Sequence, residues 1–459
     1  MNKYIYWNEN LEIRKFLDNT IVLVIKGTIG KGMPTSKSMQ RTYTVNDTAA
    51  EIIQLIDGTK TYEEIISFLS SKYNENFESI KEKILSFLDN ISKSYNISIN
   101  TREYPKKKSV NLVEKRTMYP TVASVELTNK CNIRCMHCYG NFGNKKEYVM
   151  SLDKAKTLLS DLKNIGVTTV ELTGGEITVH PNIKEILLNA INLKFNQISL
   201  LTNGIALSNE IIDIIIKNKS MILVQIDLHS LDDNYLTWFA KVPNTLNLIK
   251  SKIIKLAENN VKMRIATVVT HKNIDELEGI ADWVHSLGID HYGVSPVVSL
   301  GRAVNSDSNL FINIDDAKKL EKKLEQINNK YENLLSLIDV DRSKNKNCGC
   351  LTSHAVISPN GDIKICTMDN LEYFNSSIGN VFEKNLKDIY DDNADYINAF
   401  FNMSSPKINS LECEECKNKN FCNGCLVRGL VKSKEIGSDC KWYINKIPKI
   451  IKDRLELQY

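Results

Sequence analysis

The stretch VASVELTNKCNIRCMHCY, residues 122–139, joins an apolar, strand-like run to three closely spaced cysteines. Cys131, Cys135 and Cys138 have C-x3-C-x2-C spacing on the loop that follows the strand. Three thiolates at this spacing can bind three irons of a 4Fe-4S cluster and leave the fourth iron open to a small molecule. The alternative is a structural zinc site, but zinc needs four ligands and only His137 is a nearby candidate for the fourth. The cluster is the favoured interpretation.

Five further strand-like runs follow, separated by longer amphipathic segments. The six runs span residues 122–127, 168–173, 197–201, 222–228, 261–269 and 290–297. Strands that alternate with helices at this spacing predict an α/β fold with a parallel sheet and right-handed crossovers, curled into a partial (β/α)6 barrel. Ligands of such a barrel bind at the carboxyl ends of the strands. A helix at about 314–334 is expected to end this region.

Small and polar residues follow the second and third strands. Gly174-Gly175-Glu176 comes after the second strand, where glycines let the backbone approach a ligand closely and a carboxylate favours an ammonium group. Asn203 and Gly204 come at the end of the third strand. We expect these two residues to complete the wall of a ligand pocket through their backbone.

The fourth strand carries three polar side chains at alternate positions. Its period of two puts Gln225, Asp227 and His229 on one face, toward the barrel interior or mouth. The alternative is a polar layer inside the barrel whose members satisfy one another's hydrogen bonds.

The cysteine loop and the strand pattern together resemble the radical S-adenosylmethionine (SAM) superfamily, and the resemblance extends along the whole barrel. It implies that Cys131, Cys135 and Cys138 hold the catalytic 4Fe-4S cluster, which binds SAM and generates a 5′-deoxyadenosyl radical. Arg264, on the fifth strand, resembles an arginine that pairs with the methionine carboxylate; an ordinary exposed strand arginine is the alternative. The residues expected to bind SAM are His137, Gly174, Gly175, Glu176, Asn203, Gln225, Asp227 and Arg264. No catalytic residue is assigned beyond the cluster ligands.

Eight more cysteines lie between Cys348 and Cys440. Four of them have C-x2-C-x5-C-x2-C spacing, with five residues between the two C-x2-C pairs, whereas the two pairs of a zinc ribbon are separated by roughly 15 to 20 residues. The region resembles a SPASM domain, which implies two auxiliary 4Fe-4S clusters. The resemblance assigns one cluster to Cys348, Cys366 and Cys425, with Cys350 as either a ligand or a free thiol, and the other cluster to Cys413, Cys416, Cys422 and Cys440.

The first hundred residues predict a small unit with strands at Thr20–Lys26 and Gln40–Val45, followed by three helices. Thr48 with Glu51, and Thr61 with Glu64, have capping-box spacing. Ile80, Ile84, Leu88 and Ile91 form an apolar stripe at helical spacing. This winged-helix pattern resembles the PqqD-like recognition element of ribosomally made, modified peptides (RiPPs), which binds a leader peptide at a sheet edge. A DNA-binding winged helix is the alternative, but its third helix would be basic, and here the charges are mixed.

Composition excludes several other classes. The 459 residues are 42% hydrophobic and 25% charged with a net charge of +4, and no long basic block suggests a nucleic-acid partner. No apolar run is long enough for a membrane span, and the first residues do not form a signal peptide. We therefore expect a cytoplasmic protein, in which eleven cysteines bind metal rather than form disulfides.

These features divide the chain into a PqqD-like recognition element (1–101), a linker (102–119), a radical SAM partial barrel (120–335) and a cysteine-rich SPASM domain (336–459). The whole arrangement resembles the subtilosin-type sactipeptide synthases. The resemblance implies a precursor peptide with a leader sequence as the partner, and a flavodoxin- or ferredoxin-type protein as the external one-electron reductant. It implies abstraction of an α-hydrogen and formation of a thioether between a cysteine sulfur and the α-carbon.

Several alternatives stay open at this point. A related enzyme would form a thioether to a β- or γ-carbon, form a carbon-carbon crosslink, or epimerise a residue, and a sulfatase-type maturase is also conceivable. Epimerisation commonly needs a free thiol, which the chain offers only if one cysteine, such as Cys350, is not a ligand. The non-enzymatic alternative is a cluster-bearing protein that binds a peptide without turnover.

Overall fold

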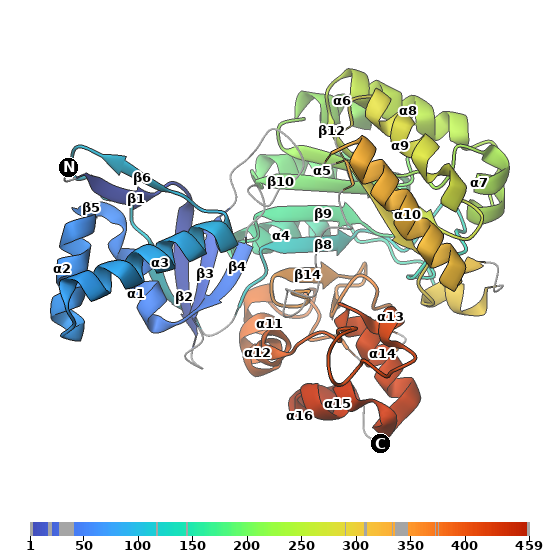
Figure 1. Cartoon of the computed structure of the whole chain (residues 1–459). Helices are drawn as coiled ribbons and strands as arrows, with labels where there is room; N and C mark the ends of the chain where they lie inside the picture. The colour runs from blue at the N-terminus through green and yellow to red at the C-terminus, as the bar shows by residue number, and fades with distance from the viewer. Residues whose placement is uncertain are drawn as a thin grey trace. The chain divides into compact units, whose positions relative to one another are not determined.

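The computed structural model describes residues 3–16, 21–26, 41–115, 118–143, 146–289, 291–306, 310–332, 334–335, 348–371, 373–374 and 376–456. The chain divides into two compact units, Met1–Thr117 and Met118–Tyr459. Both units are drawn in Figure 1, where the first is coloured blue.

The first unit combines two small sheets with helices. Its described strands are β1 (Tyr4–Trp7), β2 (Asn10–Phe16), β3 (Ile21–Lys26), β4 (Arg41–Val45), β5 (Asp57–Thr61), β6 (Ile99–Arg102) and β7 (Asn111–Lys115). Its described helices are α1 (Asp47–Leu55), α2 (Tyr62–Tyr73) and α3 (Phe77–Tyr95). The strand orders are β4-β3-β2-β7 in one sheet and β5-β1-β6 in the other.

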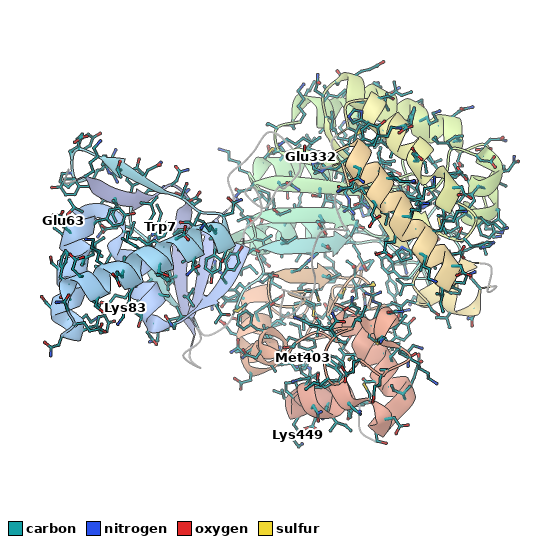
Figure 2. The ribbon with its side chains drawn as sticks, viewed as in Figure 1. Trp7, Glu63, Lys83, Glu332, Met403 and Lys449 are labelled. Atoms are coloured by element: carbon teal, nitrogen blue, oxygen red, sulfur yellow. The ribbon has the colours of Figure 1, made fainter. Side chains whose placement is uncertain are left out.

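The helices of this unit bury the residues that the sequence pattern predicts. The apolar stripe of α3 is confirmed, since the buried residues of that helix are Ile80, Ile84, Leu88 and Ile91. Trp7, labelled in Figure 2, packs into the same core and donates its Nε1–H to the Ile53 carbonyl at 2.9 Å.

The two predicted helix caps have different outcomes. The capping box of Thr61 and Glu64 is confirmed at the start of α2. The one predicted at Thr48 is wrong, because α1 begins earlier and Asn46 is its cap, accepting from the Ala49 N–H at 2.8 Å. Glu51 instead contacts Lys72 and Tyr73 of α2. Asparagine and threonine are both good caps, so spacing alone does not choose between them.

Residues 102–119, expected to be a linker, include regular structure. Strand β7 lies within this range and pairs in parallel with β2, with Ile13 opposite Leu112. This pairing covers the β2 edge of the four-stranded sheet and leaves β4 at the other edge. The boundaries predicted for the four domains otherwise remain predictions.

The second unit is built on one eight-stranded sheet. Its strands are β8 (Val122–Glu126), β9 (Thr169–Thr173), β10 (Gln197–Thr202), β11 (Ile222–Asp227), β12 (Lys262–Val269), β13 (Tyr292–Pro296), β14 (His354–Ile357) and β15 (Ile363–Lys364). The order is β13-β12-β11-β10-β9-β8-β14-β15, and only β15 runs antiparallel to its neighbour. The six strands predicted for the barrel are confirmed in sequence order.

Helices alternate with these strands and cover one face of the sheet (Figure 1). They are α4 (Leu152–Asn164), α5 (Ile183–Asn192), α6 (Asn209–Lys217), α7 (Asp233–Ala240), α8 (Leu246–Glu258) and α9 (Leu277–Ser286), followed by α10 (Ile314–Lys330). Alternate strand residues such as Val125, Leu172 and Ile226 are buried in the core with these helices. The other face carries polar side chains, among them Glu126 and Glu171, so the barrel interior is polar.

The C-terminal segment joins the sheet of the barrel. Strand β14 pairs in parallel with β8, and the rest of the segment forms α11 (Leu386–Asp392), α12 (Ala394–Asn402), α13 (Lys419–Cys422), α14 (Leu426–Ile436), α15 (Lys441–Lys446) and α16 (Lys449–Arg454). Lys364 of β15 forms an ion pair with Glu126 of β8 at 2.7 Å, with side chains only 5% and 3% exposed. Among the described helices, none is long and apolar enough to cross a membrane.

We predict that the buried pair of Glu126 and Lys364 controls how stably the C-terminal segment joins the barrel. Lys364→Met leaves a buried carboxylate without its cation and should lower the free energy of unfolding by about 3–5 kcal/mol. The double variant Glu126→Leu/Lys364→Met should recover most of that loss. Urea titration measures the free energy of unfolding of both variants. The control is Lys184→Met, which breaks an exposed ion pair with Glu210 and should change the free energy of unfolding by less than about 1 kcal/mol. A single variant as stable as this control would contradict the prediction.

Candidate active site

The three cysteines of the first group lie on the loop between β8 and α4. Two backbone hydrogen bonds hold this loop against the end of α7. The Arg134 N–H donates to the Ala240 carbonyl at 2.9 Å, and the Met136 N–H donates to the Phe239 carbonyl at 3.0 Å. Cys131, Cys135 and Cys138 line a single pocket at the carboxyl edge of the sheet. The structure therefore brings together all three cysteines that the spacing singles out.

The Gly174-Gly175 turn lies directly against the cysteine loop. The Gly175 N–H donates to the Thr128 carbonyl at 2.7 Å, and the Glu176 N–H donates to the Lys130 carbonyl at 2.8 Å. A Cβ at Gly174 would come within 2.3 Å of the Thr128 oxygen, and one at Gly175 within 2.1 Å of the Lys130 oxygen. Both glycines also line the pocket. Their small size is thus required by the neighbouring loop as well as by any ligand.

Glu176 is a buried carboxylate whose two oxygens are both held. Oε1 accepts from the Thr178 N–H at 2.9 Å, the Thr178 hydroxyl at 2.7 Å and the Thr202 hydroxyl at 2.6 Å. Oε2 accepts from the Asn203 N–H at 2.7 Å. The Asn203 side chain donates to Asn132 Oδ1 at 2.8 Å, back on the cysteine loop. This network joins the loops that follow β8, β9 and β10 into one wall of the pocket.

Of the three polar residues predicted on the fourth strand, two belong to β11 and line the pocket, whereas the third, His229, lies beyond the end of β11 at Asp227. Gln225 and Asp227 face the pocket, and burial raises the pKa of Asp227 to about 6. His229 is not among the lining residues; its Nδ1 accepts from the Val268 N–H at 3.2 Å. Arg264 is also absent from the lining and donates from Nη1 to Gln225 Oε1 at 3.1 Å. Arg264 therefore reaches the pocket through Gln225, and its predicted contact with a methionine carboxylate stays a prediction.

His137 lies inside the pocket as a neutral ring. It stacks on Phe239 at 4.8 Å between ring centroids and contacts the edge of His229 at 5.1 Å. Burial, together with the Arg302 cation, lowers the pKa of His137 to about 4. The ring is therefore uncharged near pH 7.

The pocket also contains residues that were not predicted from the sequence, among them Tyr139, Phe142 and Arg302. Tyr139 and Phe142 belong to the cysteine loop itself. Arg302 follows β13, and its guanidinium donates to the carbonyl oxygens of Cys135 and Phe142. The one available signal is its place after the carboxyl end of a barrel strand, where functional residues concentrate.

The other eight cysteines form two further groups in the C-terminal segment. Cys413, Cys416, Cys422 and Cys440 line one hollow, which Trp442 and Gly429 help to enclose. Electrostatic interactions link Cys348, Cys350, Cys366 and Cys425, and a hydrogen bond joins Cys350 to Cys348. Cys350 is only 4% exposed and belongs to the second of these groups. Both groups match the sets that the resemblance to a SPASM domain implies, and the ligation of a cluster by each residue stays a prediction.

The chemistry of these donor sets fits iron-sulfur clusters. Burial raises the pKa of Cys131 to about 11 and that of Cys366 and Cys422 to about 12, so thiolates at these positions need a bound cation to offset their charge. Within the part of the chain that the structure describes, no three His, Cys, Asp or Glu side chains converge on one point as a single metal ion requires. A cubane presents its irons at separate corners, so its ligands need not converge.

Comparison with protein families matches three parts of the chain, and two of these parts contain ten of the eleven cysteines. Residues 125–284 match the radical SAM superfamily, residues 22–94 match coenzyme PQQ synthesis protein D (PqqD), and residues 348–425 match SPASM, an iron-sulfur cluster-binding domain. The chain therefore contains a PqqD domain, a radical SAM domain and a SPASM domain. SAM and 4Fe-4S clusters are therefore its cofactors, and the predicted fold class is confirmed.

Relatives of known name and solved structures share this organisation. The chain is 28% identical to the antilisterial bacteriocin subtilosin biosynthesis protein AlbA of Bacillus subtilis, over 88% of each chain. It is 23% identical to the sporulation killing factor maturation protein SkfB of Bacillus subtilis, over 59% of this chain and 64% of that protein. The crystal structure of Streptococcus suis SuiB bound to SAM is similar in fold, with a TM-score of 0.58 at 18% identity, covering 95% of this chain and 99% of SuiB.

Substitution of Glu176 tests whether its hydrogen bonds stabilise the pocket. Each of its carboxylate oxygens accepts from a different backbone N–H, and a glutamine amide has only one oxygen to accept with. Glu176→Gln should therefore leave one buried N–H facing an NH2 group, lower the free energy of unfolding by about 1–3 kcal/mol and weaken SAM binding. Denaturant titration and SAM equilibrium binding measure the two effects. Glu185→Gln, at an exposed position on α5, is the control; equal stability of the two variants would refute the expectation.

Proposed function

We propose that this radical SAM enzyme matures a ribosomally made peptide by joining a cysteine sulfur to the α-carbon of another residue, a sactionine crosslink. The observation that carries the proposal is the presence, in one chain, of a PqqD-type unit, a radical SAM pocket and two further groups of four cysteines. Similarity to the subtilosin biosynthesis protein AlbA over 88% of both chains supports it. A structure of SuiB bound to precursor peptide SuiA supports a peptide as the substrate class.

Cys131, Cys135 and Cys138 would hold the SAM-binding cluster, and the rest of the pocket would position SAM. When bound, SAM and this cluster supply the radical that takes a hydrogen atom from the peptide. The backbone of Gly174-Gly175 and the fixed carboxylate of Glu176 would form one side of the SAM site. Burial of His137 keeps that ring neutral, so it would contact SAM without adding a charge.

Asn203, Gln225 and Asp227 would contact the polar groups of SAM from β10 and β11. Each of the three lines the pocket. Arg264 would orient Gln225 through their hydrogen bond rather than contact SAM itself. These assignments to individual residues are proposals.

The two C-terminal cysteine groups would hold auxiliary clusters and take up the electron that the oxidation releases. Tyr139 supports a short route, because it lines the SAM pocket and also lies near Cys366. Burial, with the charges of Glu126, Cys138 and Cys366, holds the pKa of Tyr139 well above its ordinary value. A flavodoxin- or ferredoxin-type protein would exchange electrons with the outer cluster.

The position of Cys350 favours crosslinking over epimerisation. An epimerase commonly returns a hydrogen atom from a free thiol that can reach the substrate. Cys350 is buried, forms a hydrogen bond with Cys348 and does not line the SAM pocket. We therefore assign it to the cluster with Cys348, Cys366 and Cys425.

Mass spectrometry of the product tests the proposed reaction. The peptide should lose two hydrogens for each crosslink, since the α-hydrogen atom leaves to 5′-deoxyadenosine and the thiol loses its proton as one electron departs. The experiment is coexpression with a short cysteine-containing reading frame encoded beside this gene, with α-deuterated acceptor residues. Deuterium should appear in 5′-deoxyadenosine, and Cys135→Ala should give unmodified peptide. An unchanged mass with a D-residue, or deuterium retained at the α-carbon, would overturn the proposal.

The leader of the precursor would bind at the free edge of β4. This strand ends its sheet, with β3 on one side and no strand beside it on the other among the described residues. Tyr43 of β4 stacks on Tyr95 of α3 at 3.8 Å between ring centroids, which gives the edge an aromatic floor. An extended peptide can add to such an edge through main-chain hydrogen bonds while its side chains pack on the floor.

We expect Tyr43→Ala to weaken leader binding without affecting the SAM pocket. The KM for the full precursor should rise, whereas SAM cleavage without peptide should stay at the wild-type rate. Fluorescence anisotropy with a labelled leader peptide measures the affinity directly. Tyr73→Ala is the matched control, because Tyr73 lies on α2 and bonds to Glu51 instead of lining β4. Equal leader affinity in the two variants would place the leader elsewhere.

A further inference from the structure

The segment after β13 lies against the cysteine loop. It forms a short 3-10 helix, η3 (Gly301–Asn305), at the carboxyl edge of the barrel. Gly301 has a φ of +57°, and a Cβ there would come within 2.1 Å of the Tyr139 oxygen and 2.5 Å of the Cys138 oxygen. The Gly301 N–H donates to the Tyr373 hydroxyl of the C-terminal segment at 2.8 Å. Two backbones therefore meet here with no room for a side chain.

Arg302 ties this segment to three points on the cysteine loop. Its backbone N–H donates to the Cys138 carbonyl at 2.9 Å, Nη1 donates to the Cys135 carbonyl at 2.6 Å, and Nη2 donates to the Phe142 carbonyl at 2.5 Å. These acceptors span residues 135–142, so the backbone and side chain of one residue together fix the shape of the loop around two of the three cysteines. Such bonds from a cation are stronger than bonds between neutral groups.

The charge of Arg302 has no counter-ion in the part of the chain that the structure describes. Among the described residues, no carboxylate lies within ion-pair distance of it, and its buried Nε–H has no hydrogen-bond partner. Arg302 lines the same pocket as Cys131, Cys135 and Cys138. A partly buried cation without a counter-ion costs free energy unless an anion binds beside it. A cluster ligated by three thiolates is such an anion.

We propose that Arg302 is a positioning residue for the SAM-binding cluster: it fixes the loop of Cys135 and Cys138 and places a positive charge beside the cluster. Reduction adds one negative charge to the cluster, so a nearby cation stabilises the reduced form more than the oxidised form. The proposal rests on the proposed ligation by Cys131, Cys135 and Cys138 and is independent of the crosslink chemistry.

A redox titration of the holoprotein, followed by electron paramagnetic resonance, tests this role. Arg302→Gln should shift the midpoint potential of the SAM-binding cluster to a more negative value and lower SAM cleavage without peptide by about 10- to 100-fold. Arg302→Lys retains the cation and should keep a potential close to that of the wild type. Arg454→Gln is the matched control, since Arg454 bonds to Asn393 and Ser377, far from this loop in sequence, and should leave the potential unchanged.

Several outcomes separate this role from a general effect on folding. Loss of cluster iron from Arg302→Gln, with Arg302→Lys still loaded at the wild-type potential, would also support the proposal. A wild-type potential and iron content in Arg302→Gln would overturn it, as would equal shifts in Arg302→Gln and Arg302→Lys. Failure of the wild-type enzyme to crosslink a peptide would reject the proposed function and leave these readouts intact.

Discussion

The close backbone contact between the loops after β8 and β9 is the constraint on which the rest of the pocket depends. Two hydrogen bonds, from the N–H groups of Gly175 and Glu176 to the Thr128 and Lys130 carbonyls, set the path of the chain into the first cysteine. Because a Cβ on Gly174 or Gly175 would clash with those same oxygens, the contact requires glycine at both positions. The Glu176 carboxylate then reaches across to β10, so the position of one loop determines the next.

The C-terminal segment continues this arrangement instead of forming a separate body. Strand β14 extends the barrel sheet beyond β8, and the buried pair of Glu126 and Lys364 joins β8 to β15, two residues before Cys366. Strand β8, which leads into Cys131, is thus hydrogen-bonded to β14, which lies close in sequence to Cys350 of the second cysteine group (Cys348, Cys350, Cys366 and Cys425). The spacing between the SAM pocket and that second group is therefore set by a sheet, which is stiffer than a loop and suits electron transfer over a fixed distance.

Periodic patterns in the sequence were enough to predict the strands of the barrel and the buried face of a helix. Alternation predicted the six barrel strands, and the stripe from Ile80 to Ile91 predicted the buried face of α3. Cysteine spacing predicted the first group of three cysteines, whereas the two groups of four came from the resemblance to a SPASM domain. Features that depend on distant partners were not predictable in the same way. The pairing of β7 with β2 and of β14 with β8, and the bonds of Arg302 to the cysteine loop, join residues whose proximity no local pattern encodes.

The distribution of cysteines also limits the chemistry that can follow hydrogen abstraction. All eleven fall into one group of three and two groups of four, so if each group holds a cluster no protein thiol remains to donate a hydrogen atom. A carbon-centred radical on the peptide must then either take back its original hydrogen or lose an electron and form a bond. A thiol of the peptide itself is the natural partner for that bond, and Tyr139, which interacts with both Cys138 and Cys366, lies on the proposed route for the electron. If all eleven cysteines bind clusters, the lack of a free protein thiol favours oxidation over epimerisation.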